Sequence, residues 1–206
     1  TTEDGVTWKQ IPENPVIRNT DAPGKRLTEW RDPFVFRWKG KIYCLVAGIV
    51  DEKYGAVHLY TTNDFRSWTY VNEFFRNTCA KEVMECPNLI VYGDKVLFIH
   101  SIWDIRVLHW FVGTITEEGK LEVYNQGSVD YGDFFASQIS FDEKGRTLMW
   151  GWLREDPRRG LFTDGEWSGV QAIPRVICIN EENELVQERL PEFETLRRTD
   201  EEVQLQ

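Results

Sequence analysis

The sequence has little of the chemistry on which metal, redox and nucleic-acid proteins depend. Its 206 residues include three His and four Cys, and no Cys-x-x-Cys pair or metal-ligand spacing brings them together. Acidic residues outnumber basic ones by 34 to 24, and the net charge of −10 disfavours nucleic acids and anionic membranes as partners. No apolar run approaches the length of a membrane-spanning helix. We therefore expect no metal site, no cofactor, no nucleic-acid partner and no membrane segment.

Helical patterns and targeting signals are also missing. We find no amphipathic helix of useful length. The chain opens on Thr1-Thr2-Glu3-Asp4, without an initiating Met or an apolar signal region, as if in the middle of a protein. Localisation and oligomeric state are therefore left open, and the expected fold class is all-β.

Aromatic residues, in contrast, are abundant: nine Trp, twelve Phe and seven Tyr. Aromatic rings stack on the C–H faces of sugars, but they more commonly fill the cores of β-sheets. The composition is thus compatible with a carbohydrate protein without identifying one.

An internal repeat is the first strong signal. Thr1-Thr2-Glu3-Asp4-Gly5-Val6-Thr7-Trp8 matches Thr61-Thr62-Asn63-Asp64-Phe65-Arg66-Ser67-Trp68 at an offset of 60 residues. Each copy predicts the end of one strand, a turn centred on Asp and a strand that opens with Trp. A chance pair of hairpins is the alternative.

A second repeated element consists of an acidic residue, a short strand, a tight turn and a more apolar strand. It begins at Asp32, at Glu85 and, more loosely, at Asp133. With further strand candidates after each pair, there are four short strands in each unit of about fifty residues, which is typical of a propeller blade. We predict roughly three and a half blades of a larger β-propeller. A β-sandwich would not explain why the acidic residue recurs in each unit.

The recurring acidic residues suggest a shared site. The innermost strand of every blade lines the central channel, so Asp32, Glu85 and Asp133 would point into one funnel. Paired carboxyl groups suit glycoside hydrolysis, in which one protonates the leaving oxygen and another attacks or stabilises the sugar cation. Taken singly, an Asp-Pro dipeptide is more often a turn, and a Glu before Cys carries little information.

Several motifs resemble one known family in the same order along the chain. Trp30–Phe36 resembles the Arg-Asp-Pro motif of glycoside hydrolase family 32, the invertase, inulinase and levanase family, and Glu85–Leu89 resembles its Glu-Cys motif. Asp130–Gln138 resembles the fourth-blade motif. Trp150–Trp152 and Trp167–Arg175 resemble segments near the end of the family's propeller.

The resemblance implies a fold and an activity. The family has a five-bladed β-propeller, usually followed by a β-sandwich, so residues 1–196 would form a partial catalytic propeller and 197–206 the start of a linker. Its members cleave β-fructofuranosidic bonds with retention, through a fructosyl-enzyme intermediate. The implied partner is a small-molecule or polymeric fructoside such as sucrose or a fructan.

The resemblance also implies roles for the residues of this chain that match the family's motifs. Glu85 would be the general acid/base, and Asp32 would bind fructose hydroxyls and stabilise the oxocarbenium-like transition state. Arg31 would neighbour both carboxylates and could orient Asp32 by a charge-assisted hydrogen bond.

Three further residues are predicted to bind substrate, and each of them also has a purely structural interpretation. Cys86 either contacts the sugar or is a packed thiol, and Trp152 either walls the fructose pocket or packs structurally. Asp133, like Asp130 nearby, either contacts the substrate or, as the preferred interpretation, supports a turn behind it.

One family motif is missing. The family's nucleophile is an Asp in a Trp-Met-Asn-Asp-Pro-Asn-Gly type motif, which does not occur here, and the context of Asp21 does not match it. Because retaining chemistry needs two carboxyl groups in opposite roles, we expect the chain as given not to turn over. The alternative is a non-catalytic fructan-binding propeller, or a subunit whose site is completed by another chain.

Overall fold

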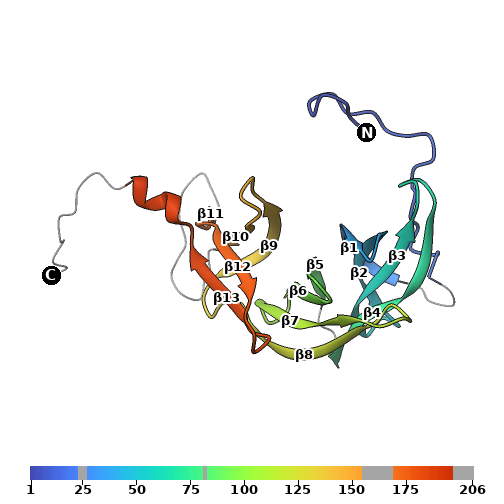
Figure 1. Cartoon of the computed structure of the whole chain (residues 1–206). Helices are drawn as coiled ribbons and strands as arrows, with labels where there is room; N and C mark the ends of the chain where they lie inside the picture. Colours follow the sequence, from blue (N-terminus) through green and yellow to red (C-terminus); the bar gives the residue numbers. More distant parts are fainter. Residues whose placement is uncertain (23–26, 81–82, 155–168, 197–206) are drawn as a thin grey trace.

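The computed structural model describes residues 1–22, 27–80, 83–154 and 169–196. Its strands form three antiparallel sheets, which lie side by side in an open arc (Figure 1). The all-β prediction with repeated four-stranded units is therefore confirmed. The predicted linker at 197–206 lies outside the described residues.

The first sheet contains four strands that pair in chain order: β1 (Leu27–Trp38), β2 (Lys41–Val50), β3 (Tyr54–Thr62) and β4 (Trp68–Ala80). The hairpin between β1 and β2 has a two-residue loop, Lys39-Gly40, in which both residues have positive φ. This conformation matches the twist of the flanking strands and explains the tight turn.

The second sheet repeats the plan with β5 (Met84–Tyr92), β6 (Lys95–Ile102), β7 (Val107–Ile115) and β8 (Leu121–Ser128). It lies in the middle of the arc, and β5 contacts both β1 of the first sheet and β9 of the third (Figure 1).

The third sheet consists of β9 (Phe134–Phe141), β10 (Thr147–Leu153), β12 (Arg175–Ile179) and β13 (Leu185–Arg189). The short β11 (Val170–Gln171) pairs with the end of β10, so that β11 and β12 lie along the same neighbour. In Figure 1 the first strand of each sheet faces the inside of the arc.

The alternation of side chains along β6 shows how the sheets are joined. Val96 and Phe98 belong to the core cluster shared with the first sheet, whereas Leu97 and Ile99 belong to the cluster shared with the third. Successive residues of a strand point to opposite faces, so an almost continuous apolar run is what a sheet buried on both faces requires.

The N-terminal repeat is confirmed as a turn but not as a strand. Asp4 Oδ1 accepts hydrogen bonds from the backbone N–H groups of Val6 and Thr7, and Asp64 Oδ1 accepts the corresponding pair from Arg66 and Ser67. Residues 1–22 nevertheless contain no strand, so the predicted half blade is represented by this turn alone.

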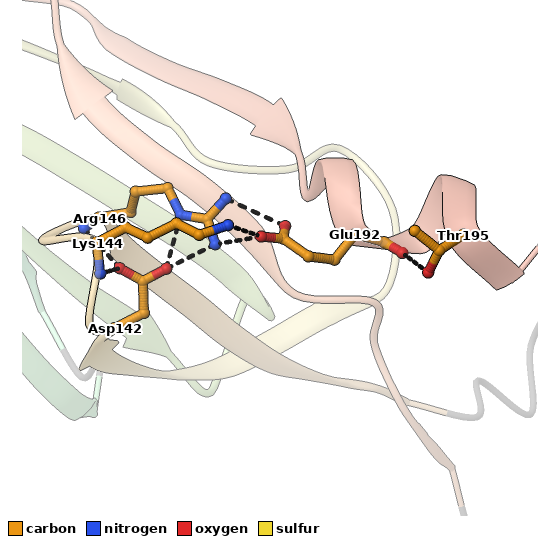
Figure 2. Close-up of polar contacts among 5 residues, drawn as sticks. All are labelled: Asp142, Lys144, Arg146, Glu192 and Thr195. Carbon is orange, nitrogen blue, oxygen red and sulfur yellow. Dashed lines mark hydrogen bonds and ion pairs between the residues drawn. The ribbon is translucent and has the colours of Figure 1, made fainter.

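The last described element is the 3-10 helix η2 (Pro191–Leu196). Its Glu192 carboxylate accepts hydrogen bonds from Lys144 and Arg146 in the turn between β9 and β10, and Asp142 holds Arg146 from the other side (Figure 2). This network attaches η2 to the third sheet. Within the described residues, no helix is long and apolar enough to cross a membrane.

Candidate active site

Each inner strand has a β-bulge at the same place. Asp32 in β1, Cys86 in β5 and Ala136 in β9 all have positive φ, at 55°, 47° and 50°. The pairing register of each strand shifts at these residues. Bulges commonly re-aim side chains next to active sites. The three sheets therefore present the same local backbone to the inside of the arc.

The bulges correct the predicted alignment of the repeat. Asp32 corresponds to Cys86, and Glu85 corresponds to Arg31, because Arg31 and Glu85 are the last paired residues before each bulge. The prediction that Asp32 and Glu85 occupy equivalent places is wrong by one residue. Asp133 does not occupy the place either, since it precedes β9 and lies three residues before Ala136.

The structure nevertheless brings Asp32 and Glu85 into one site. The Asp32 carboxylate accepts a hydrogen bond from the backbone N–H of Cys86, with Oδ2 and N 2.8 Å apart. Arg31 Nη1 donates to Glu85 Oε1 at 2.6 Å, and the same guanidinium bonds the Glu29 carboxylate. The resemblance placed Arg31 next to both carboxylates, with a hydrogen bond to Asp32 as one option, and its described contacts are with Glu85 and Glu29. Two crossed contacts thus join the first sheet to the second.

The Glu85 carboxyl lies in surroundings that disfavour its charged form. Its side chain is only 14% exposed, and burial raises its pKa above the ordinary value of 4.5. The charges of Asp32 and Asp104 act in the same direction, whereas Arg31 opposes them. A carboxyl group that holds its proton above its ordinary range is suited to general acid catalysis.

Cys86 is not a nucleophile in this arrangement. Burial, followed by the charges of Asp32 and Glu85, raises the pKa of its thiol to about 12. Because the thiolate is the reactive form of cysteine, the thiol stays protonated and unreactive at neutral pH.

Asp133 and Asp130 lie at the entrance to the third sheet. Asp133 Oδ1 is 3.9 Å from Arg154 Nη2, and the Asp133 carbonyl accepts a hydrogen bond from the Arg154 backbone. Asp130 accepts from Arg175 at 2.7 Å and also from the N–H of Gly132. The contacts of Asp130 are those of a residue that shapes and anchors a turn.

Trp152 lies opposite the bulge of the third sheet, in register with Phe135, as Ser101 is with Glu85 in the second sheet. Its indole is 37% exposed and lies so close to Gly169 that a Cβ there would come within 1.9 Å of Nε1. Among the described residues, no hydrogen bond, ion pair or ring contact joins Trp152 to Glu85 or Asp32.

Asn88 has a role that the sequence analysis missed. Its fully buried amide donates to the carbonyl of Cys86 at 2.8 Å and to that of Ser137 at 2.9 Å, so it links the bulges of the second and third sheets. The Ser101 hydroxyl similarly accepts a hydrogen bond from the N–H of Ala136. Pro33 and Pro87 each directly follow a bulge residue. Aligning these two prolines would have matched Asp32 with Cys86 from the sequence alone.

Chemically, the site offers a shielded proton donor at Glu85 and a second carboxylate at Asp32 on the neighbouring sheet. Within the part of the chain that the structure describes, no group of three or more His, Cys, Asp or Glu side chains could hold a metal ion. The arrangement supports proton transfer and stabilisation of positive charge.

Repeated antiparallel sheets set in an arc define a partial β-propeller, and its first two inner strands bring two carboxyl groups together. The model of the glycosyl hydrolases family 32 N-terminal domain matches residues 1–189, and the chain belongs to this family.

Relatives and solved structures agree with this assignment. The chain is 29% identical to the fructan 6-exohydrolase of Beta vulgaris and 26% identical to a β-fructofuranosidase of Oryza sativa, each over 94% of its length. It spans 36% and 37% of these two relatives. The fold is similar to that of a Bombyx mori β-fructofuranosidase, with a TM-score of 0.75, 21% identity and coverage of 96% of this chain and 44% of that one. The fructan 1-exohydrolase IIa of Cichorium intybus gives a TM-score of 0.72, 24% identity and coverage of 93% and 40%.

Proposed function

We propose that this chain contributes the acid/base and the transition-state stabiliser to a retaining glycosidase that cleaves β-fructofuranosidic bonds. Glu85 protonates the leaving oxygen, and Asp32 binds the fructosyl unit as positive charge develops on it. The proposed substrates are sucrose and fructans. Relatives described as fructan exohydrolases and β-fructofuranosidases support this class, as do similar structures described in complex with sucrose and 1-kestose.

The observation that carries the proposal is the environment of Glu85. The Glu85 side chain is largely shielded, its pKa is raised, Arg31 holds it and a second carboxylate, Asp32, lies nearby. Arg31 is shared between Glu85 and Glu29, and burial still outweighs its charge in setting the pKa of Glu85. Perturbed titration in combination with a specific charge partner is typical of functional sites.

A retaining glycosidase needs a nucleophile as well as an acid/base, and neither proposed role is that of a nucleophile. If Glu85 is the acid/base and Asp32 the stabiliser, the nucleophile must be a further carboxylate. We propose that the 206 residues as given bind fructosides but do not hydrolyse them.

The alternative is a propeller that binds fructans without catalysis, or a subunit completed by another chain. A pure binding protein gains nothing from a proton donor whose burial costs stability. The raised pKa of Glu85 therefore favours the catalytic proposal.

The test compares binding and turnover in the same preparation. Titration calorimetry with sucrose and 1-kestose should show saturable binding that weakens in Asp32→Ala, with Tyr124→Phe on β8, the last strand of the second sheet, as a control. Chromatography of the same samples should show no release of fructose. Hydrolysis by the 206-residue chain would contradict the proposed lack of a nucleophile, and absence of binding would contradict the proposed substrate class.

A further inference from the structure

Trp103 is a large aromatic residue that the proposed catalytic roles leave unused, and its neighbour Asp104 lies close enough to Glu85 to raise the pKa of that carboxyl. It begins the turn between β6 and β7. Its backbone N–H donates to the carbonyl of Val83 at 3.1 Å, and the N–H of Val83 donates to Asp104 Oδ2 at 2.8 Å. These two bonds hold the turn against the residues that lead into Glu85.

The pairing register places Trp103 on the same side of the sheet as Glu85. Glu85 pairs with Ser101, and Val83 is joined to Trp103 two residues further on. Side chains two apart along a strand share a face, and diagonal neighbours on that face lie within reach of aromatic side chains. The face is the one towards the third sheet, since the Trp103 ring lies edge-on to Phe135 with centroids 6.3 Å apart.

Trp103 is about half exposed to solvent. It is 48% exposed, while Phe135 beneath it is fully buried, and Arg106 lies 5.9 Å from its ring centroid. An indole fixed by neighbours but accessible to solvent is a ready platform for the apolar C–H face of a sugar, because little conformational freedom is lost on stacking.

We propose that Trp103 forms the subsite for the leaving group, and that a neutral sugar stacks on its indole. This inference rests on the proposed role of Glu85. An acid that protonates the leaving oxygen must lie next to the departing sugar, whereas Asp32 on the first sheet binds the fructosyl unit. Trp103 lies on the side of Glu85 that faces the third sheet, away from Asp32, which is the side left for the leaving group.

The test separates the two subsites by ligand. Affinities for sucrose and for methyl β-D-fructofuranoside, whose methyl group is too small to stack, are measured by calorimetry on the full 206-residue chain. Trp103→Ala should weaken sucrose binding by about five- to tenfold and leave the methyl fructoside within about twofold. Trp103→Phe should restore most of the loss. Ile105→Ala, an exposed residue of the same turn, is the matched control and should change neither affinity.

An equal loss for both ligands in Trp103→Ala would overturn the inference, because it would indicate a general structural effect or a contact with fructose itself. Unchanged sucrose affinity would also overturn it. If the unmodified chain binds neither ligand, the proposed function fails first and the inference falls with it. Each outcome is therefore distinct.

Discussion

Glu85 lies between one cation and two anions. Arg31 donates to its carboxylate, while Asp32 and Asp104 lie close enough to oppose its ionisation, and burial adds to their effect. The charged form is therefore disfavoured despite the ion pair. For the proposed role of Glu85 this balance is favourable, because a general acid needs its protonated form and a raised pKa favours that form.

Replacement of Glu85 should lower the rate of hydrolysis most for substrates whose leaving group needs a proton. In a form of the protein that turns over fructosides, we expect Glu85→Gln to lower kcat/KM for sucrose by about 10²–10⁴-fold. A fructoside with a nitrophenol leaving group should lose far less, because that group departs without protonation. Steady-state rates on both substrates provide the measurement. Equal losses on the two would contradict the acid/base assignment.

Glu85→Gln should lower activity but slightly raise the stability of the fold at neutral pH. A carboxyl group whose folded pKa is raised contributes stability below its unfolded pKa, and that contribution is lost as pH rises through the folded value. Above the ordinary pKa of a glutamate, the raised pKa of Glu85 therefore lowers the stability of the fold, and Glu85→Gln removes this cost. We expect a small increase in Tm at pH 7 that shrinks towards pH 4, measured by calorimetric melting. A larger increase at pH 4 than at pH 7 would contradict the direction of the pKa shift.

At the scale of the element, the inner strands depend on their bulges. Each bulge leaves backbone groups outside the regular ladder, and neighbouring sheets satisfy some of them. Asp32 accepts from the N–H of Cys86, and Ser101 accepts from the N–H of Ala136. Asn88 donates to two carbonyls across the second and third sheets. The site geometry is therefore a property of adjacent strands together.

Asn88 is the clearest test of this dependence. Asn88→Leu keeps the branched shape and the number of side-chain heavy atoms but removes both donors, so the buried carbonyls of Cys86 and Ser137 lose a partner. We expect a loss of roughly 1–3 kcal/mol for each carbonyl left unpaired, measured by urea unfolding. The control is Asn125→Leu in β8. Within the described residues the Asn125 side chain accepts one hydrogen bond, from the N–H of Gln126, so the change should alter stability by less than about 0.5 kcal/mol. Similar effects from the two variants would argue against the link between bulges.

For the molecule as a whole, the sheets are held in their arc by apolar contacts, and the end of the described chain is held by charge. Glu192 in η2 bonds Lys144 and Arg146 of the third sheet (Figure 2). These hydrogen bonds lower the pKa of the Glu192 carboxyl to about 2. The contact should therefore survive well below the ordinary pKa of a glutamate.

Acid should release η2 before it unfolds the sheets. A carboxyl group with a lowered pKa stabilises the contact above its unfolded pKa, and the effect fades as pH falls towards 2. We expect pepsin to cleave next to Phe193 only slowly near pH 4 and readily near pH 2, relative to a free peptide of residues 190–196. In Glu192→Gln cleavage should be fast already at pH 4. Equal cleavage of the two proteins at pH 4 would show that the network does not hold η2.

The sequence by itself determined the strands, the repeated four-stranded unit and the family motifs around Asp32 and Glu85. These follow from short-range patterns: apolar alternation, tight turns and Asp-centred loops are local and periodic, so they can be identified without a partner strand. The structure confirmed the four-stranded unit in the first two sheets and, with the short β11 added, in the third, but not a strand within residues 1–22.

Only the tertiary structure decided how the residues of the site meet. Register across a bulge depends on which residue takes the positive φ, and a shift of one residue sends a side chain to the other face. Because of the bulges, Asp32 occupies the place that corresponds to Cys86 and accepts its N–H, while Arg31 bonds Glu85. Asn88 links the bulges of the second and third sheets. These residues contact residues of other sheets. The sequence of one strand does not specify which strand of another sheet will lie next to it.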